Sequence, residues 1–166
     1  MITSLLMLIL LVPPPSPKVS LFLAAPTKDG FVDTNKGIQD SIKDIRKRLA
    51  KDKRIVIVDD PSRADMVLTV VARGISYERT GQTQVTTNYF DSESTTRVET
   101  TTQDIYSSEM WVKTVLKLGH MEREVNGGYS NEPGGWGACA TQITDDVKSW
   151  VAANAPRIVQ LRKATR

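Results

Sequence analysis

With 166 residues, of which 40% are hydrophobic and 25% charged, the chain has the size of one domain with one core, which argues against a second domain. Lys and Arg outnumber Asp and Glu only by 22 to 19, so the net charge of +3 is too small to indicate a nucleic-acid partner. The single cysteine, Cys139, excludes an intramolecular disulfide, and with the single histidine, His120, it cannot complete a zinc site. We therefore expect no structural metal and no cofactor.

Residues 1–17 predict a signal peptide or a short apolar leader. The run from Ile2 to Val12 is apolar except for two residues, and four of the next five residues are prolines, which end a helix. This run is shorter than the roughly twenty apolar residues that span a bilayer. The alternative is a misassigned start codon or a buried first strand, because no Lys or Arg precedes the run and no clear cleavage site follows it. We expect an extracytoplasmic location, in the periplasm, where the protein would contact the membrane only through the leader if the leader is uncleaved.

The folded domain is predicted to span residues 18–166. Its first element is an apolar strand from Lys18 to Pro26. An amphipathic helix follows from about Thr34 to Asp52, because apolar residues recur there at helical spacing: Ile38, Ile42, Ile45 and Leu49. Two short strands, Arg54 to Asp59 and Met66 to Ala72, are separated by a turn at Pro61.

The segment from Ser76 to Asp104 is rich in Thr, Ser, Gln and Asn, so it has no face that could be buried. It predicts either an exposed hairpin arm or a mobile loop, and its length is typical of a segment used for contact. Tyr77, Tyr89 and Phe90 are its candidate binding residues, since aromatic side chains supply much of the energy of interfaces. The alternative is that these three side chains cover the edge of the sheet.

After this segment, Ile105 to Leu118 alternates like a strand, Gly119-His120 predicts a turn, and Met121 to Val125 predicts a partner strand. A last helix is expected up to Asn154, with Pro156 ending or kinking it. The element order β-α-β-β-β-β-α predicts an α+β fold: a mostly antiparallel sheet of about five strands with two helices on one face.

Cys139 is the candidate nucleophile of the chain. It lies at the start of the last helix, where free N–H groups and the helix dipole favour a thiolate, and His120 is the candidate base. Glu122 or Glu124 would then orient the imidazole. The alternative is a small buried cysteine that faces the sheet. Trp136, between glycines, is expected to enter the core or to contact a partner.

The basic run from Lys43 to Arg54 is the candidate phosphate-binding segment. Asp44 and Asp52 interrupt it, Asp40 lies just before it, and no aromatic residue interleaves with it, so we interpret it as a solvated helix face. Nucleic acid is therefore not expected as a partner.

Four segments in order resemble the small α+β domains of bacterial envelope proteins of the CsgG, LpoB and TolB N-terminal type: KVSLFLAAP, GIQDSIKDIRKRL, RIVIVD and ADMVLTVVARG. The resemblance covers residues 18–79 and depends on element order. It implies non-enzymatic work at the cell envelope, with another envelope protein as the partner. The chain lacks the lipid-anchor cysteine that several such proteins carry, and its later part reads like an uncharacterised exported bacterial domain.

Taken together, these features predict a non-catalytic, extracytoplasmic protein-binding or envelope-assembly accessory domain. The alternative is a cysteine-dependent hydrolase or transferase that uses Cys139 with His120.

Overall fold

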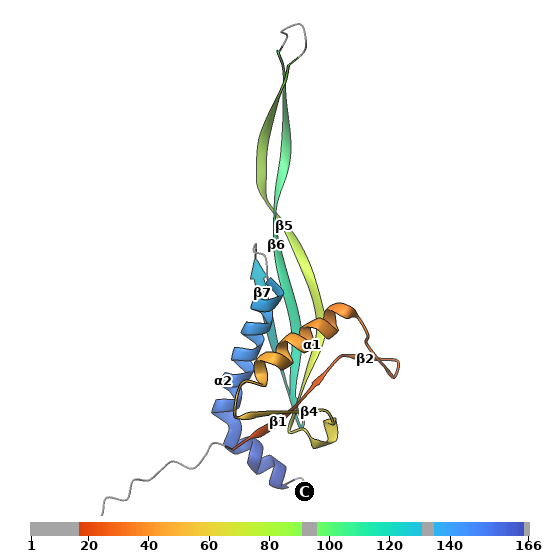
Figure 1. Ribbon diagram of the computed structural model, residues 1–166, viewed down its shortest axis with the longest axis vertical. Helices are drawn as coiled ribbons and strands as arrows, with labels where there is room; N and C mark the ends of the chain where they lie inside the picture. The colour runs from red at the N-terminus through yellow and green to blue at the C-terminus, as the bar shows by residue number, and fades with distance from the viewer. Residues whose placement is uncertain (1–16, 91–95, 131–134, 165–166) are drawn as a thin grey trace, which may run out of the picture.

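The computed structural model describes residues 17–90, 96–130 and 135–164. In chain order its elements are β1 (Val19–Ala24), β2 (Thr27–Lys28), β3 (Phe31–Val32), α1 (Lys36–Leu49), β4 (Ile55–Val58), the 3₁₀ turn η1 (Pro61–Arg63), β5 (Met66–Phe90), β6 (Thr96–Leu118), β7 (Met121–Ser130) and α2 (Gly135–Ala164). In the described part of the chain, five strands form one sheet in the order β4-β1-β5-β6-β7. The predicted α+β class, with a five-stranded sheet and two helices, is confirmed (Figure 1).

The prediction of a mostly antiparallel sheet is wrong, because the sheet is mixed. β1 is parallel to both of its neighbours, β4 and β5, whereas β5, β6 and β7 are antiparallel. The physical reason is the connection between strands. A helix that follows a strand carries the chain back to the end of the sheet at which that strand began, so α1 places β4 parallel to β1.

Helix α1 forms where the apolar spacing predicts it. The side chain of Asn35 caps its first turn by accepting hydrogen bonds from the backbone N–H groups of Gly37 at 2.9 Å and Ile38 at 3.3 Å. Ile38, Ile45 and Leu49 are buried against the sheet. The lysines and arginines between them face away, so the helix has one apolar face.

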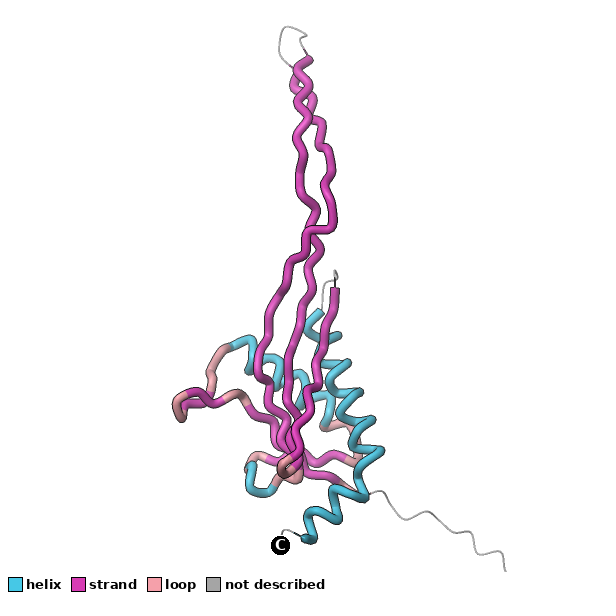
Figure 2. The backbone as a smooth tube through the Cα atoms, turned by 180° about the vertical axis from the view of Figure 1, so that it is seen from behind, coloured by secondary structure: helices cyan, strands magenta, loops and turns pink. Residues whose placement is uncertain are grey.

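Helix α2 is longer than the sequence predicts, because it continues through Pro156 to Ala164. Figure 2 shows that α2 changes direction near its C-terminal end, as expected where a proline removes a helical hydrogen bond. The last turns therefore lie at the end of the sheet where β1 and β5 begin, and Arg162 pairs there with Asp65.

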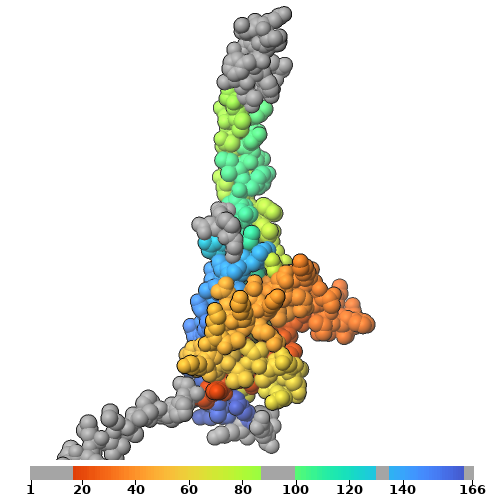
Figure 3. All heavy atoms as spheres, in the orientation of Figure 1, coloured from red at the N-terminus to blue at the C-terminus, as the bar shows by residue number. Residues whose placement is uncertain are grey.

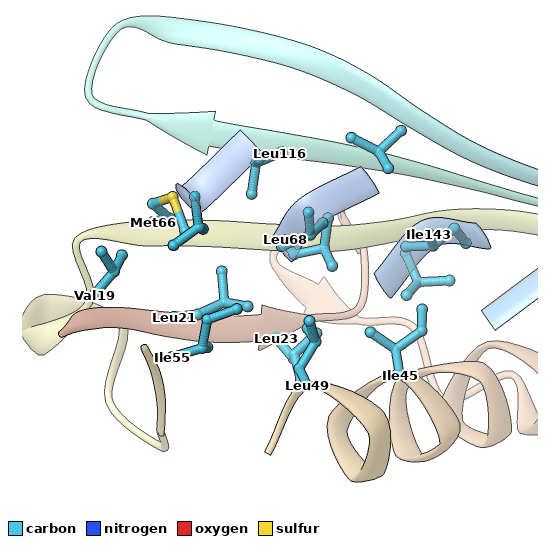
Figure 4. Packing of buried hydrophobic residues seen from close by; sticks show 14 of the residues in the cluster. Val19, Leu21, Leu23, Ile45, Leu49, Ile55, Met66, Leu68, Leu116 and Ile143 are labelled. Atoms are coloured by element: carbon cyan, nitrogen blue, oxygen red, sulfur yellow. The ribbon is translucent and has the colours of Figure 1, made fainter. Parts of the chain in front are cut away.

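The core lies between the helices and one face of the sheet. α1 packs on β1, β4 and β5, whereas α2 packs on β6 and β7 and also contacts α1. Side chains from both layers interlock in Figure 4, and the largest of those fully buried are Leu21, Ile45, Leu49, Met66, Leu68, Ile143 and Ile158. Because both helices pack on one face of the sheet, no helix of the described residues covers the other face.

Candidate functional site

The longest feature of the molecule is the hairpin of β5 and β6. β5 pairs with β1 only as far as Thr69, and β6 pairs with β7 only as far as Glu109. From Ser76 to Phe90, β5 therefore pairs with β6 alone within the described residues. We call residues 76–104 the arm. Its first strand extends over about 45 Å at the usual rise of about 3.3 Å per residue.

The arm stands clear of the rest of the molecule (Figures 1 and 3). Its side chains are held across the two strands by polar contacts: Gln82 donates to Asp104 at 3.0 Å, and Arg79 pairs with the same carboxylate at 2.7 Å. A register shift between Arg79 and Gly81 twists the ribbon at this point. In residues 76–86 and 100–104, whose side chains the structure describes, the arm is thus a hydrogen-bonded ribbon without an apolar core.

Exposed apolar side chains gather where the arm leaves the body. Ile75, Tyr77 and Tyr106 are 43%, 71% and 59% exposed, and we call these three residues the base patch. Tyr77 is paired with Ser108, so Tyr106 lies diagonally across from it on the same face of the ribbon. Large exposed aromatic side chains close together are typical of binding surfaces rather than of a solvated ribbon.

Only one residue of this patch was a predicted binding residue. Tyr77 belongs to it, whereas Tyr89 and Phe90 have side chains outside the described residues, although their backbone forms the end of β5. Tyr106 and Ile75 were missed. The alternation of Ile105 to Leu118 could have found Tyr106, because it lies on the same face as Met110 and Val112 but beyond the end of β7.

Trp136 lies at the start of α2 and is partly buried. Its ring packs against the core at the start of α2, and the guanidinium of Arg73 lies 3.7 Å from the ring centroid. Arg73 also donates a hydrogen bond of 2.8 Å to the carbonyl of Gly37. One arginine of β5 therefore links the first turns of both helices.

Cys139 is fully buried where α2 crosses β6. Its Sγ lies 3.4 Å from the carbonyl of Met110, and its backbone packs against Gly127. Burial raises the pKa of the Cys139 thiol, and the nearby Glu109 carboxylate adds to this although Arg73 opposes it. The surroundings of the thiol thus disfavour the thiolate.

The structure does not bring His120 to Cys139. His120 is exposed in the turn after Leu118, and the eight residue steps of β6 from Met110 to Leu118 span roughly 26 Å. Glu122 and Glu124, the two candidates for orienting the imidazole, point from β7 to solvent. These groups share no site.

His120 instead lines an open pocket of about 500 Å³ at the end of the sheet opposite the arm. Its walls come from η1 and the segment after it, the turn between β6 and β7, and the end of α2. Polar groups in it already hold the fold, because Arg162 pairs with Asp65 and the Ser62 hydroxyl donates to Asp60 at 2.7 Å.

Two other kinds of site are absent from the described residues. No group of three or more His, Cys, Asp or Glu side chains is arranged there to hold a metal ion. No helix in that part of the chain combines the length and hydropathy needed to cross a bilayer.

The fold and the arm define an α+β domain that carries a projecting hairpin. Among known proteins, no family model matches the chain and no curated protein matches its sequence.

Proposed function

We propose that this chain is a non-catalytic domain that binds another protein outside the cytoplasm, with the arm as its contact element. The observation that carries the proposal is the ribbon from Ser76 to Asp104, which leaves the sheet and exposes aromatic side chains at its base. Its role would be that of an accessory to an assembly in the cell envelope.

The low stability expected of an isolated hairpin supports this proposal. An isolated two-stranded hairpin is marginally stable in water, because it has neither a third strand nor a packed face. The described residues of the arm, 76–90 and 96–104, form such a hairpin, yet the chain devotes 29 residues, 76–104, to the arm. A contact with a partner would supply the missing face, which gives the length of the arm a physical purpose.

The chemistry of the arm indicates how a partner would bind. The outer edges of both strands present backbone N–H and C=O groups, which can pair with an extended segment of another protein. The Thr, Ser and Gln side chains keep the ribbon polar, and the base patch adds an apolar anchor. We expect backbone pairing along the arm and side-chain burial at Tyr77 and Tyr106.

The extracytoplasmic location is a proposal that depends on the apolar run from Ile2 to Val12 and on the element order of residues 18–79. An envelope protein is accordingly the proposed class of partner.

A photo-reactive amino acid in place of Tyr106 tests the proposal in cells that naturally make the protein. We expect one discrete adduct, identified by mass spectrometry as an exported protein other than this chain. The matched control carries the same amino acid in place of the exposed Lys51 and should give no such adduct. A Tyr106 variant that forms no adduct, or forms adducts only with cytoplasmic proteins, would contradict the proposal.

A further inference from the structure

Positive and negative charges are distributed unevenly along the molecule. The arm, residues 76–104, contains two Arg, no Lys and five Asp or Glu residues, so its net charge is −3. Since the whole chain has a net charge of +3, the remaining residues together carry +6. Such a difference between two parts of a chain orients the molecule at a charged surface.

Four exposed basic side chains surround the start of β1, at the end of the sheet opposite the arm (Figure 1). We call them the basic end: Lys18, Lys51, Lys53 and Arg63. Hydrogen bonds place them together. The N–H of Val19 donates to the carbonyl of Arg54 at 2.8 Å, which brings the turn between α1 and β4 beside the start of β1. Ser20 Oγ donates to the carbonyl of Arg63 at 3.0 Å.

Two aspartates near the start of β1 are paired with other basic residues. Asp52 pairs with Arg54 at 2.6 Å, and Asp65 pairs with Arg162. Their side chains are only 10% and 7% exposed. Within the described residues, no member of the basic end takes part in an ion pair. Its four charges are therefore free to act on a partner.

The acidic side chains that remain at this end are too few to cancel its charge. Asp59 pairs with Arg46 on α1 at 2.9 Å, whereas Asp60 caps η1. Counting Asp60 against the four basic residues leaves a net charge of +3. The adjoining sequence does not reduce this charge, because residues 1–17 contain no Asp or Glu, and residues 163–166 contain two basic residues and no acidic one.

Apolar residues accompany the basic end. In the sequence, only residues 13–17 separate it from the apolar run of residues 2–12. On the last turns of α2, Leu161 is 38% exposed. Basic residues beside an apolar segment are typical of chains that contact anionic lipids. Binding of single-stranded nucleic acid uses aromatic side chains among the basic ones, and residues 51–63 and 155–164 contain none.

We propose that the basic end binds the surface of a bilayer that contains anionic phospholipids. The four cations lie against the headgroups, and the arm, with its net charge of −3, points away from the bilayer. The folded domain itself thus provides a membrane contact, in addition to any contact made by a leader. Each Lys or Arg near such a surface strengthens binding by about fivefold.

Co-sedimentation of the full chain with vesicles tests the proposal. At about 0.1 M salt, phosphatidylcholine vesicles with about one third phosphatidylglycerol should bind the chain at least about tenfold more tightly than pure phosphatidylcholine vesicles. An apolar leader would bind both kinds of vesicle about equally, so the ratio reports the charge of the domain. About 0.5 M salt, at which the Debye length is about 4 Å, should remove most of this preference.

A pair of double variants locates the binding surface. Lys51→Gln with Lys53→Gln should lower the affinity for the anionic vesicles by at least about tenfold, because two of the four cations are lost. Lys28→Gln with Lys36→Gln is the matched control, since both lysines are exposed on β2 and at the start of α1, and the net charge of the chain falls equally. The control should lower the affinity by less than about threefold.

Circular dichroism establishes that each variant is folded, and the salt dependence of the wild type tests the proposal without any variant. Equal binding of the wild type to anionic and neutral vesicles, or an equal loss of affinity in the two double variants, overturns the proposal. Tighter binding to duplex DNA than to the anionic vesicles also overturns it and assigns the basic end to nucleic acid. A chain without the arm should bind the anionic vesicles at least as tightly as the wild type, so loss of partner binding and loss of membrane binding can be told apart.

Discussion

At the scale of single residues, the surroundings of Cys139 predict an unreactive thiol. The side chain is fully buried, and burial raises the pKa of the thiol, so little thiolate is present near neutral pH. In a titration with a thiol reagent at pH 7.5 (about one unit below the usual pKa of Cys), we expect no fast reaction of the native chain and one equivalent after denaturation. A fast native reaction would restore Cys139 as a candidate nucleophile.

Asp65 connects α2, through Arg162, to β1, through Ser20. Its carboxylate accepts hydrogen bonds from the backbone N–H of Ser20 at 2.7 Å and from Arg162 Nε at 2.6 Å. Burial alone would raise the pKa of Asp65, but the hydrogen bonds from Arg162 and Ser20 outweigh it, and the pKa is lowered. The ionised carboxylate therefore stabilises the fold.

The sign of the pH dependence follows from this shift. Because the folded pKa lies below the unfolded value of 3.8, the stabilisation is fully present above about pH 4 and is lost as the pH falls through the folded pKa. Asp65→Asn should lower the free energy of unfolding at pH 7 by about 2 to 3 kcal/mol.

Urea unfolding at pH 7 measures this loss of stability. Asp59→Asn is the control, because the Asp59 side chain is 88% exposed and its pair with Arg46 is worth less than about 1 kcal/mol. Equal stability of the two variants at pH 7 would contradict the role given to Asp65.

At the scale of elements, the packing of α2 on β7 depends on a glycine. A Cβ atom at Gly127 would overlap the backbone of Cys139, because the first turn of α2 lies directly on the strand. Gly127→Ala should therefore cost about 2 to 3 kcal/mol of stability, since backbone cannot move aside as a side-chain end can. Gly81→Ala is the matched control, because Gly81 lies in β5 with no atom within 4 Å of an added Cβ. The melting temperature of this variant should be close to that of the wild type.

The elements also show how far the sequence can be interpreted. The apolar stripe of Ile38, Ile45 and Leu49 predicts α1 because burial imposes helical spacing on the sequence. Residues 76–104 carry no such signal. Their described side chains, in residues 76–86 and 100–104, are buried on neither face of the ribbon, so the sequence could not distinguish a hairpin from a loop. Strand direction was misjudged because it depends on the connection through α1, which periodicity does not report.

The candidate site could be predicted only in part. Tyr77 stood out as an aromatic residue in a polar segment. Tyr106 lies 29 positions later in the sequence, and only the strand register brings it next to Tyr77. The distance between Cys139 and His120 was equally hidden, because the turn after Leu118 places His120 at the far end of β6. Pairings across a sheet are properties of the fold and are not marked by local sequence.

At the scale of the whole molecule, the two ends of the sheet differ in what extends from them. The arm projects from one end, whereas β1 begins at the other, where Arg162 donates to the Lys18 carbonyl at 3.1 Å (Figure 1). The arm thus extends away from the point where residues 1–17 join the domain. A leader that holds the chain at a surface would leave the arm free to reach a partner.

Cell fractionation and the intact mass of the untagged product test the proposed location. We expect a periplasmic product whose N-terminus lies between residues 12 and 18, because the apolar run of residues 2–12 would direct export and be removed, whereas β1, which begins at Val19, must stay in the sheet. A product of full length in the cytoplasm would contradict the proposed location and leave the binding role of the arm to be judged by its own test.

The measurement that tests the account most directly is partner affinity with and without the arm. Deleting residues 80–103 together with the substitution Ile105→Gly leaves a two-residue Asp-Gly turn between the paired residues Arg79 and Tyr106, and this sequence suits a type I′ hairpin. The account predicts a shortened chain that melts within about 5 °C of the wild type. Its affinity for the protein captured at Tyr106 should fall by at least about tenfold, equivalent to about 1.4 kcal/mol. A folded variant that binds this partner with unchanged affinity would contradict the account.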